Sequence, residues 1–266
     1  MCKLNLRSLA EACFVRAKKL IAKGDEYSVR YACLELRFAM EYLIYQQMEY
    51  YKDELPDDAI KKWTPRQLIS EMLTVDPYAD QSSTIAIYPE KSSGEGGYRL
   101  GDDKRFTLKW ANKNYNALSN FLHAANLHQL YSGNLHSHEN ILEKAQDIIK
   151  VIEDKFSSHI FGNNLGVFYN LECLCGRKFN RRQGSFREED GIICPSCGAI
   201  HDIVRDDTAI GGKFSYKRRQ ILYKCLSCET DNYIDAHKIS FGKIIVCTKC
   251  GNKVKIIFAL EQLNGK

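Results

Sequence analysis

Eight of the eleven cysteines stand in close pairs near the C-terminus. The pairs are Cys173/Cys175, Cys194/Cys197, Cys225/Cys228 and Cys247/Cys250. Eighteen residues separate Cys175 from Cys194, and eighteen again separate Cys228 from Cys247. Two close pairs with a spacer of this length have the spacing of a zinc site, in which four thiolates surround the metal as a tetrahedron. The cysteines therefore predict two Zn²⁺ ions per chain.

The cysteine pattern is an internal repeat, because a shift of 53 residues superimposes the last three cysteines of the first set on those of the second. Strand-like segments flank each second pair, at 191–194 and 243–247 before it and at 199–204 and 253–260 after it. Each unit is thus predicted to be a zinc ribbon. The pair Cys173/Cys175 departs from the pattern, with one intervening residue where the other pairs have two. This predicts a shifted ligand or a less regular first site.

Disulfides are the alternative use of these cysteines. They are rare in the cytosol, and the first residues lack the apolar stretch of a secretory signal. We therefore expect zinc rather than disulfides, and a cytoplasmic location. His201 and His237 are candidate substitute ligands, although ordinary strand or surface positions are favoured for both. The chain has no run of 18 apolar residues, so no membrane span is expected.

The formal charge is uneven along the chain. Residues 1–165 carry a net charge of −1 and residues 166–266 a net charge of +6. Each zinc bound by four thiolates contributes −2, which reduces the C-terminal excess to about +2. Basic character therefore matters only where cations cluster.

Two clusters mix cations with aromatic residues, RKFNRR at 177–182 and KFSYKRR at 213–219. Cations that contact phosphates and rings that stack on bases are the groups that bind single-stranded nucleic acid. Solvated hairpin loops are an equally weighted alternative. The candidate contacts are Arg177, Lys178, Arg181, Arg182, Lys217, Arg218 and Arg219.

The N-terminal region has the periodicity of helices. Helices are expected at 5–23, 28–51, 65–74, 107–125 and 138–158. The long insertion at 76–106 contains two strand-like segments that could pair as a hairpin. The predicted fold class is a mainly α bundle over residues 1–160, a hinge at 161–168, and two small β zinc ribbons at 169–208 and 220–263.

The helix at 28–51 is predicted to be central, because it has two apolar faces. One face carries Val29, Cys33, Leu36, Met40 and Leu43, and the other carries Leu34, Phe38 and Tyr45. Between the faces, Arg37 and Glu41 are four residues apart and could form an ion pair.

Two segments, YACLELRFAMEYLIY (31–45) and YNALSNFLH (115–123), resemble helices of HEPN-like domains. The resemblance covers about residues 5–160. It implies a compact bundle that often dimerises. Many HEPN domains are metal-independent ribonucleases of prokaryotic toxin–antitoxin and anti-phage systems, and others are not catalytic. The nucleases carry an arginine, four to six further residues and a histidine.

This chain lacks that arginine. For His123 it would stand at positions 116–118, which are Asn116, Ala117 and Leu118, and no other histidine has a suitably placed arginine. Asn116, Asn120 and His123 are expected on one helical face. Arg37, positioned by Glu41, is the best candidate to neutralise a phosphate in their place.

Three functions remain open from the sequence. The first is a nucleic-acid-binding protein, RNA being favoured, whose helical domain dimerises or docks a partner, in the setting of cellular defence. The second is a ribonuclease that uses His123, Asn116, Asn120, Arg37 and Glu41. The third is an adaptor whose ribbons bind another protein.

Overall fold

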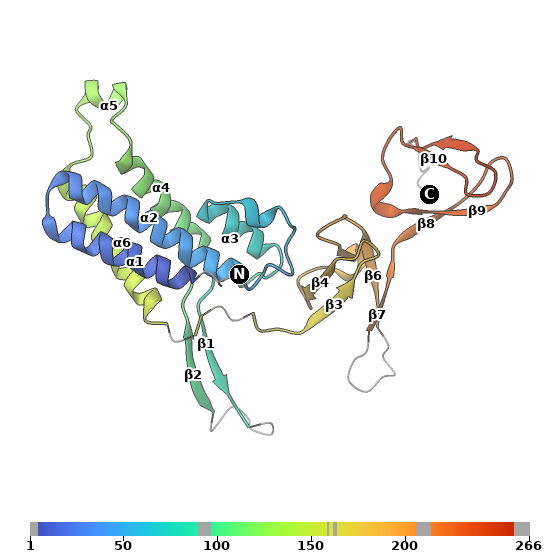
Figure 1. Ribbon diagram of the computed structural model, residues 1–266, viewed down its shortest axis with the longest axis horizontal. Coiled ribbons are helices and arrows are strands. Elements are labelled where there is room, and N and C mark those ends of the chain that lie inside the picture. The colour runs from blue at the N-terminus through green and yellow to red at the C-terminus, as the bar shows by residue number, and fades with distance from the viewer. Residues whose placement is uncertain (1–4, 90–96, 159, 162–163, 206–213, 258–266) are drawn as a thin grey trace, which may run out of the picture. The chain divides into compact units, whose positions relative to one another are not determined.

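The structure is a computed structural model that describes residues 5–89, 97–158, 160–161, 164–205 and 214–257 (Figure 1). The chain divides into two compact units, residues 1–167 and 168–266. The first unit contains the helices, and the second contains small antiparallel sheets with the paired cysteines. The predicted fold class is therefore confirmed.

The helical unit has the five expected helices, one further α-helix and one short 3-10 helix. Its helical elements are α1 (Leu6–Lys23), α2 (Glu26–Met48), η1 (Ala59–Lys61), α3 (Pro65–Leu73), α4 (Leu108–Leu122), α5 (Leu127–Ser132) and α6 (His138–Phe156). Each α-helix begins after a polar residue whose side chain accepts a hydrogen bond from the first turn, as Asp25 does from the N–H of Ser28. Gly24, in the left-handed conformation, ends α1. The unpredicted α5 has no buried side chain.

Helix α2 packs against α1, α3, α4 and α6, so its central position is confirmed. All five residues of its first predicted apolar face are buried. The second face is only partly covered, because Phe38 is 40 % exposed. Tyr27 and Tyr31, which share this side of the helix, are 77 % and 62 % exposed. Within the described unit, therefore, α2 has an apolar face that its neighbours cover only in part.

The insertion contains the predicted hairpin. Strands β1 (Ser83–Ile87) and β2 (Tyr98–Asp103) pair antiparallel. Just after β2, the guanidinium of Arg105 forms a buried ion pair with Asp103 and donates to the hydroxyl of Tyr51. These contacts anchor the base of the hairpin to the helices.

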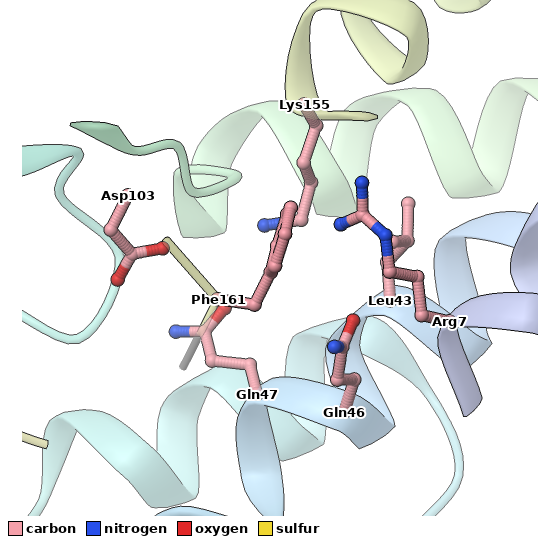
Figure 2. A pocket seen from close by; sticks show the side chains of 7 residues that line it. All are labelled: Arg7, Leu43, Gln46, Gln47, Asp103, Lys155 and Phe161. Carbon is pink, nitrogen blue, oxygen red and sulfur yellow. The ribbon is translucent and has the colours of Figure 1, made fainter. Parts of the chain in front are cut away.

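A cavity of about 20 Å³ lies beside this anchor, room for about one water molecule. Figure 2 shows its lining residues, Arg7, Leu43, Gln46, Gln47, Asp103, Lys155 and Phe161. The Arg7 guanidinium stacks on the Phe161 ring at 3.4 Å. The Lys155 ammonium donates to the carbonyl of Lys104. Burial lowers the pKa of Lys155 to about 8, with Arg105 and Arg7 adding to the effect and Asp103 opposing it.

We expect Lys155→Met to stabilise the helical unit at pH 7. The unfolded chain holds the lysine proton up to its ordinary pKa of 10.5, whereas the folded protein releases it near pH 8. The cost of burying the charge is therefore complete below pH 8 and disappears as the pH approaches 10.5. Its upper limit is about 3.5 kcal/mol, at about 1.4 kcal/mol per pKa unit, and partial access of solvent to the side chain reduces it.

Melting followed by helical circular dichroism between pH 7 and pH 10 measures the effect. The difference in midpoint between Lys155→Met and the natural protein should shrink as the pH rises. Lys18→Met, which removes an exposed lysine, is the control. A difference in melting midpoint that stays constant from pH 7 to pH 10 would contradict the lowered pKa of Lys155.

The second unit consists of short strands. They are β3 (Phe168–Glu172), β4 (Lys178–Arg182), β5 (Ile192–Ile193), β6 (Ile200–Arg205), β7 (Phe214–Arg218), β8 (Gln220–Lys224), β9 (Asp231–Asp235), β10 (Ile244–Val246) and β11 (Lys253–Lys255). Strands β3–β4, β8–β9 and β10–β11 form two-stranded sheets, and β5–β6–β7 form a three-stranded one. We call β3–β7 ribbon 1 and β8–β11 ribbon 2.

The two ribbons differ in their cores. Ribbon 1 buries an apolar cluster that includes Tyr169, Leu171, Phe179 and Ile192. In the described part of ribbon 2, the buried residues are Cys225, Asn232, Asp235 and Cys247. Ribbon 2 therefore has little apolar burial to hold it together apart from its cysteines.

Candidate metal centres

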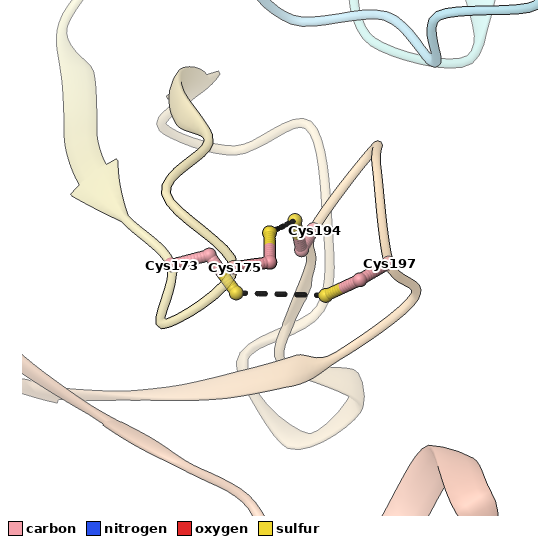
Figure 3. Close-up of side chains that lie close together, drawn as sticks. All are labelled: Cys173, Cys175, Cys194 and Cys197. Atoms are coloured by element: carbon pink, nitrogen blue, oxygen red, sulfur yellow. Dashed lines mark hydrogen bonds between the residues drawn. The ribbon is translucent and has the colours of Figure 1, made fainter.

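The first four cysteines converge on one point (Figure 3). The Sγ atoms of Cys173 and Cys197 are 3.6 Å apart, and those of Cys175 and Cys194 are 3.7 Å apart. Four sulfurs in a tetrahedron around zinc, with bonds of about 2.3 Å, lie about 3.8 Å from one another. A disulfide would bring two sulfurs to about 2.05 Å. The spacing therefore fits one zinc ion, and all four cysteines are free of disulfides.

The second site repeats this geometry. Its Sγ distances are 3.6 Å between Cys225 and Cys250 and 3.7 Å between Cys228 and Cys247. In each group the sulfurs all lie within 4.8 Å of one another. The two tetracysteine groups thus fit two zinc ions per chain, as predicted. The short pair Cys173/Cys175 joins its site as the longer pairs do, and within the described residues neither His201 nor His237 belongs to a metal group.

Tight turns place the sulfurs. The N–H of Gly198 donates to the carbonyl of Cys194, and the N–H of Gly251 donates to that of Cys247. Both glycines have a positive φ, 75° and 74°, which costs glycine little. In the Cys225 turn the corresponding residue is Glu229, at φ 55°. The repeat therefore keeps the turn geometry at a position where the residue type has changed.

Asn232 supports the second site, and cysteine spacing alone gave no sign of it. Its buried side chain contacts the sulfur of Cys247 and accepts from the backbone N–H of Thr248. Hydrogen bonds from the backbone of Cys250 and Lys249 lower the pKa of the Cys247 thiol, which favours the thiolate that zinc requires. Polar groups that hydrogen-bond to a metal ligand, as Asn232 does, hold that ligand in its orientation.

His201 lies in the core of ribbon 1. Its ring packs against Phe179 and Tyr216, with centroids 6.1 and 5.7 Å away. Burial, with Arg218 nearby, lowers its pKa. A neutral histidine packed between aromatic rings is a structural residue.

Two of the arginines predicted to contact nucleic acid form ion pairs within the protein. Arg218 pairs with Asp235 at 3.0 Å, and Arg219 pairs with Asp202 at 2.6 Å. Arg219 also donates to the carbonyl of Glu189. Arg218 therefore links β7 of ribbon 1 to β9 of ribbon 2, whereas the side chain of Arg219 binds within ribbon 1. Lys217, by contrast, is exposed.

Strand alternation separates the remaining predicted cations. Phe179 is buried, so Lys178, Asn180 and Arg182 project from the opposite face of β4. On β3, Phe168, Asn170 and Glu172 share that face, directly opposite Arg182, Asn180 and Lys178. The Glu172 carboxylate pairs with the Lys178 ammonium at 3.7 Å. The guanidinium of Arg182 lies over the Phe168 ring at 5.1 Å. We call these six residues the β3–β4 outer face. Arg181 lies on the other side of β4.

The candidate catalytic residues are arranged differently from the expectation. Helix α4 ends at Leu122, and His123 is its C-terminal cap, whose N–H donates to the carbonyl of Asn120; the shared face of Asn116, Asn120 and His123 stays a prediction. The hydroxyl of Tyr115 lies between Arg37 and Glu41, accepting from the first and donating to the second. Burial raises the pKa of Glu41. Arg37 is thus held at Tyr115, eight positions before His123, which corresponds to about 12 Å along a helix.

Comparisons with known proteins returned no match, whether to family models, curated proteins or solved structures. None of the described helices combines the length and apolarity needed to cross a bilayer. What the fold and sites define is a helical bundle joined to two tetracysteine modules that fit zinc. The HEPN resemblance remains a prediction.

Proposed function

We propose that this protein binds single-stranded nucleic acid, preferably RNA, through ribbon 1. The observation that supports this most directly is the β3–β4 outer face, which combines a ring, a guanidinium, two amides and a lysine that pairs with one carboxylate. A base can stack on the Arg182 guanidinium, which itself lies over the Phe168 ring. Lys178 can exchange its exposed partner Glu172 for a phosphate. Asn170 and Asn180 can hydrogen-bond to base edges. Zinc keeps the loop ends of these strands in place.

The test is fluorescence anisotropy with a labelled single-stranded RNA of about 12 nucleotides. Phe168→Leu combined with Arg182→Gln should weaken binding at least tenfold, since stacking alone contributes about 1–3 kcal/mol per base. The salt dependence of the affinity should also become shallower, because fewer counterions are released. Arg187→Gln removes the same charge from an exposed residue of the same ribbon and should have little effect. Equal losses in both variants would reject the proposed face.

The length of the RNA after the same binding reactions tests the ribonuclease alternative. RNA shortened by the natural protein but intact with His123→Ala would favour catalysis in the helical unit. The geometry around Arg37 gives this alternative no particular support. Its assignment, like a role in defence, rests on the HEPN resemblance.

The helical unit is proposed to mediate homodimerisation in the cytoplasm. The partly covered side of α2, with Tyr27, Tyr31 and Phe38, supports this, since exposed apolar patches often mark protein contacts. Sedimentation equilibrium of Tyr31→Glu against the natural chain would test it.

A further inference from the structure

Ribbon 2 exposes many large apolar side chains although its described part buries few. They are Ile221, Leu222, Leu226, Tyr233, Phe241, Ile244, Val246 and Ile257. A module of this size would normally bury such residues in a core. Contiguous exposed apolar surface on a soluble protein marks a site of interaction.

Strands β10 and β11 arrange part of this surface in rows. Ile244 and Val246 project from the same face of β10, and are 60 % and 51 % exposed. Directly opposite them on β11 are Lys255 and Lys253, both exposed. We call these four residues the β10–β11 outer face. An apolar row therefore lies beside a cationic row.

Apart from the zinc-ligating cysteines, the charged side chains of this region are all cationic. Residues 239–257 contain four lysines and no aspartate or glutamate. Neither Lys253 nor Lys255 has a side-chain ion pair or hydrogen bond within the part of the chain that the structure describes. A ligand with carboxylates beside an apolar stripe would therefore complement both rows.

We infer that the β10–β11 outer face binds an acidic amphipathic helix of a partner protein. The apolar stripe of such a helix would cover Ile244 and Val246, and its flanking carboxylates would pair with Lys253 and Lys255. RNA fits this face less well, because aliphatic side chains do not offer the stacking surface that aromatic rings offer to bases. A membrane fits less well too, since the lysines stand level with the apolar row and would enter the bilayer with it.

This inference is independent of the RNA-binding face on ribbon 1. The probe is a fluorescein-labelled synthetic helix of about 18 residues, with leucines on one face and glutamates along its border. A second peptide replaces every glutamate with lysine. Anisotropy with the zinc-loaded full chain should show at least tenfold tighter binding of the glutamate peptide.

Charge reversal provides the decisive comparison. Lys253→Glu/Lys255→Glu should exchange the preference, so that the lysine peptide binds more tightly. Lys224→Glu/Lys243→Glu makes the same change in net charge away from this face and should keep the preference for glutamate. Ile244→Ser/Val246→Ser should weaken both peptides at least tenfold. Zinc content, measured for every variant, confirms that ribbon 2 is intact.

Several results would overturn the inference. One is an unchanged preference in Lys253→Glu/Lys255→Glu with normal zinc content. Another is loss of binding to single-stranded RNA, or to vesicles containing phosphatidylserine, in that variant while peptide binding is unaffected. A third is peptide binding that begins only after residues 258–266 are removed, because the face would then belong to the chain's own C-terminal segment.

Discussion

Removing zinc should unfold ribbon 2 and strongly destabilise ribbon 1 while the helices remain. The tetracysteine groups have the sulfur spacing of zinc sites, and structural zinc contributes about 10–16 kcal/mol of apparent binding free energy to such small modules. The helical unit has a separate core that contains no paired cysteine. We therefore expect two equivalents of zinc in protein purified without added metal.

Elemental analysis measures the ratio of zinc to protein, and a strong chelator under reducing conditions removes the zinc. Helical circular dichroism should change little, because every described α-helix lies within residues 6–156. Protease sensitivity should rise sharply beyond residue 168. Zinc far below two equivalents, or cysteines found in disulfides, would contradict the assignment. Cys33→Ser, which removes a buried cysteine of α2, should leave the zinc content at two.

Loss of a single zinc should affect the two ribbons unequally. Cys194→Ser and Cys247→Ser remove the equivalent ligand from ribbon 1 and ribbon 2, and each should lower the zinc content to one. Ribbon 1 retains its apolar cluster around Phe179 and Ile192, whereas described ribbon 2 has no such cluster. Cys247→Ser should therefore unfold ribbon 2 completely. Cys194→Ser should destabilise ribbon 1 but leave it partly collapsed.

Hydrogen exchange of the full chain, followed by mass spectrometry, distinguishes these outcomes. In Cys247→Ser, peptides covering β10 and β11 should exchange as fast as an unfolded chain. In Cys194→Ser, peptides covering β3, β4 and β6 should keep measurable protection. The intact ribbon of each variant is the internal control. Equal loss of protection in both would show that the apolar cluster contributes no stability without zinc.

The sequence alone determined the metal chemistry and most helix positions. Zinc ligands are recognisable from spacing because each tight turn places two sulfurs locally, whatever surrounds it. Helix positions were predictable for a similar reason, since each segment carries its own apolar periodicity, although α2 begins at Glu26, after the cap Asp25, rather than at residue 28. The hairpin of the insertion also depended on neighbouring residues only.

Tertiary structure decided which charged and apolar side chains are available to partners. Arg218 and Arg219 are part of a basic cluster in the sequence, but carboxylates at Asp235 and Asp202 neutralise them after folding. Phe38 has the periodicity of a core residue, yet its unit leaves it 40 % exposed. Tyr115 reaches Arg37 and Glu41 from another helix and separates a pair that sequence spacing would have joined. Contacts between distant segments depend on how the elements pack, and local sequence does not encode that packing directly.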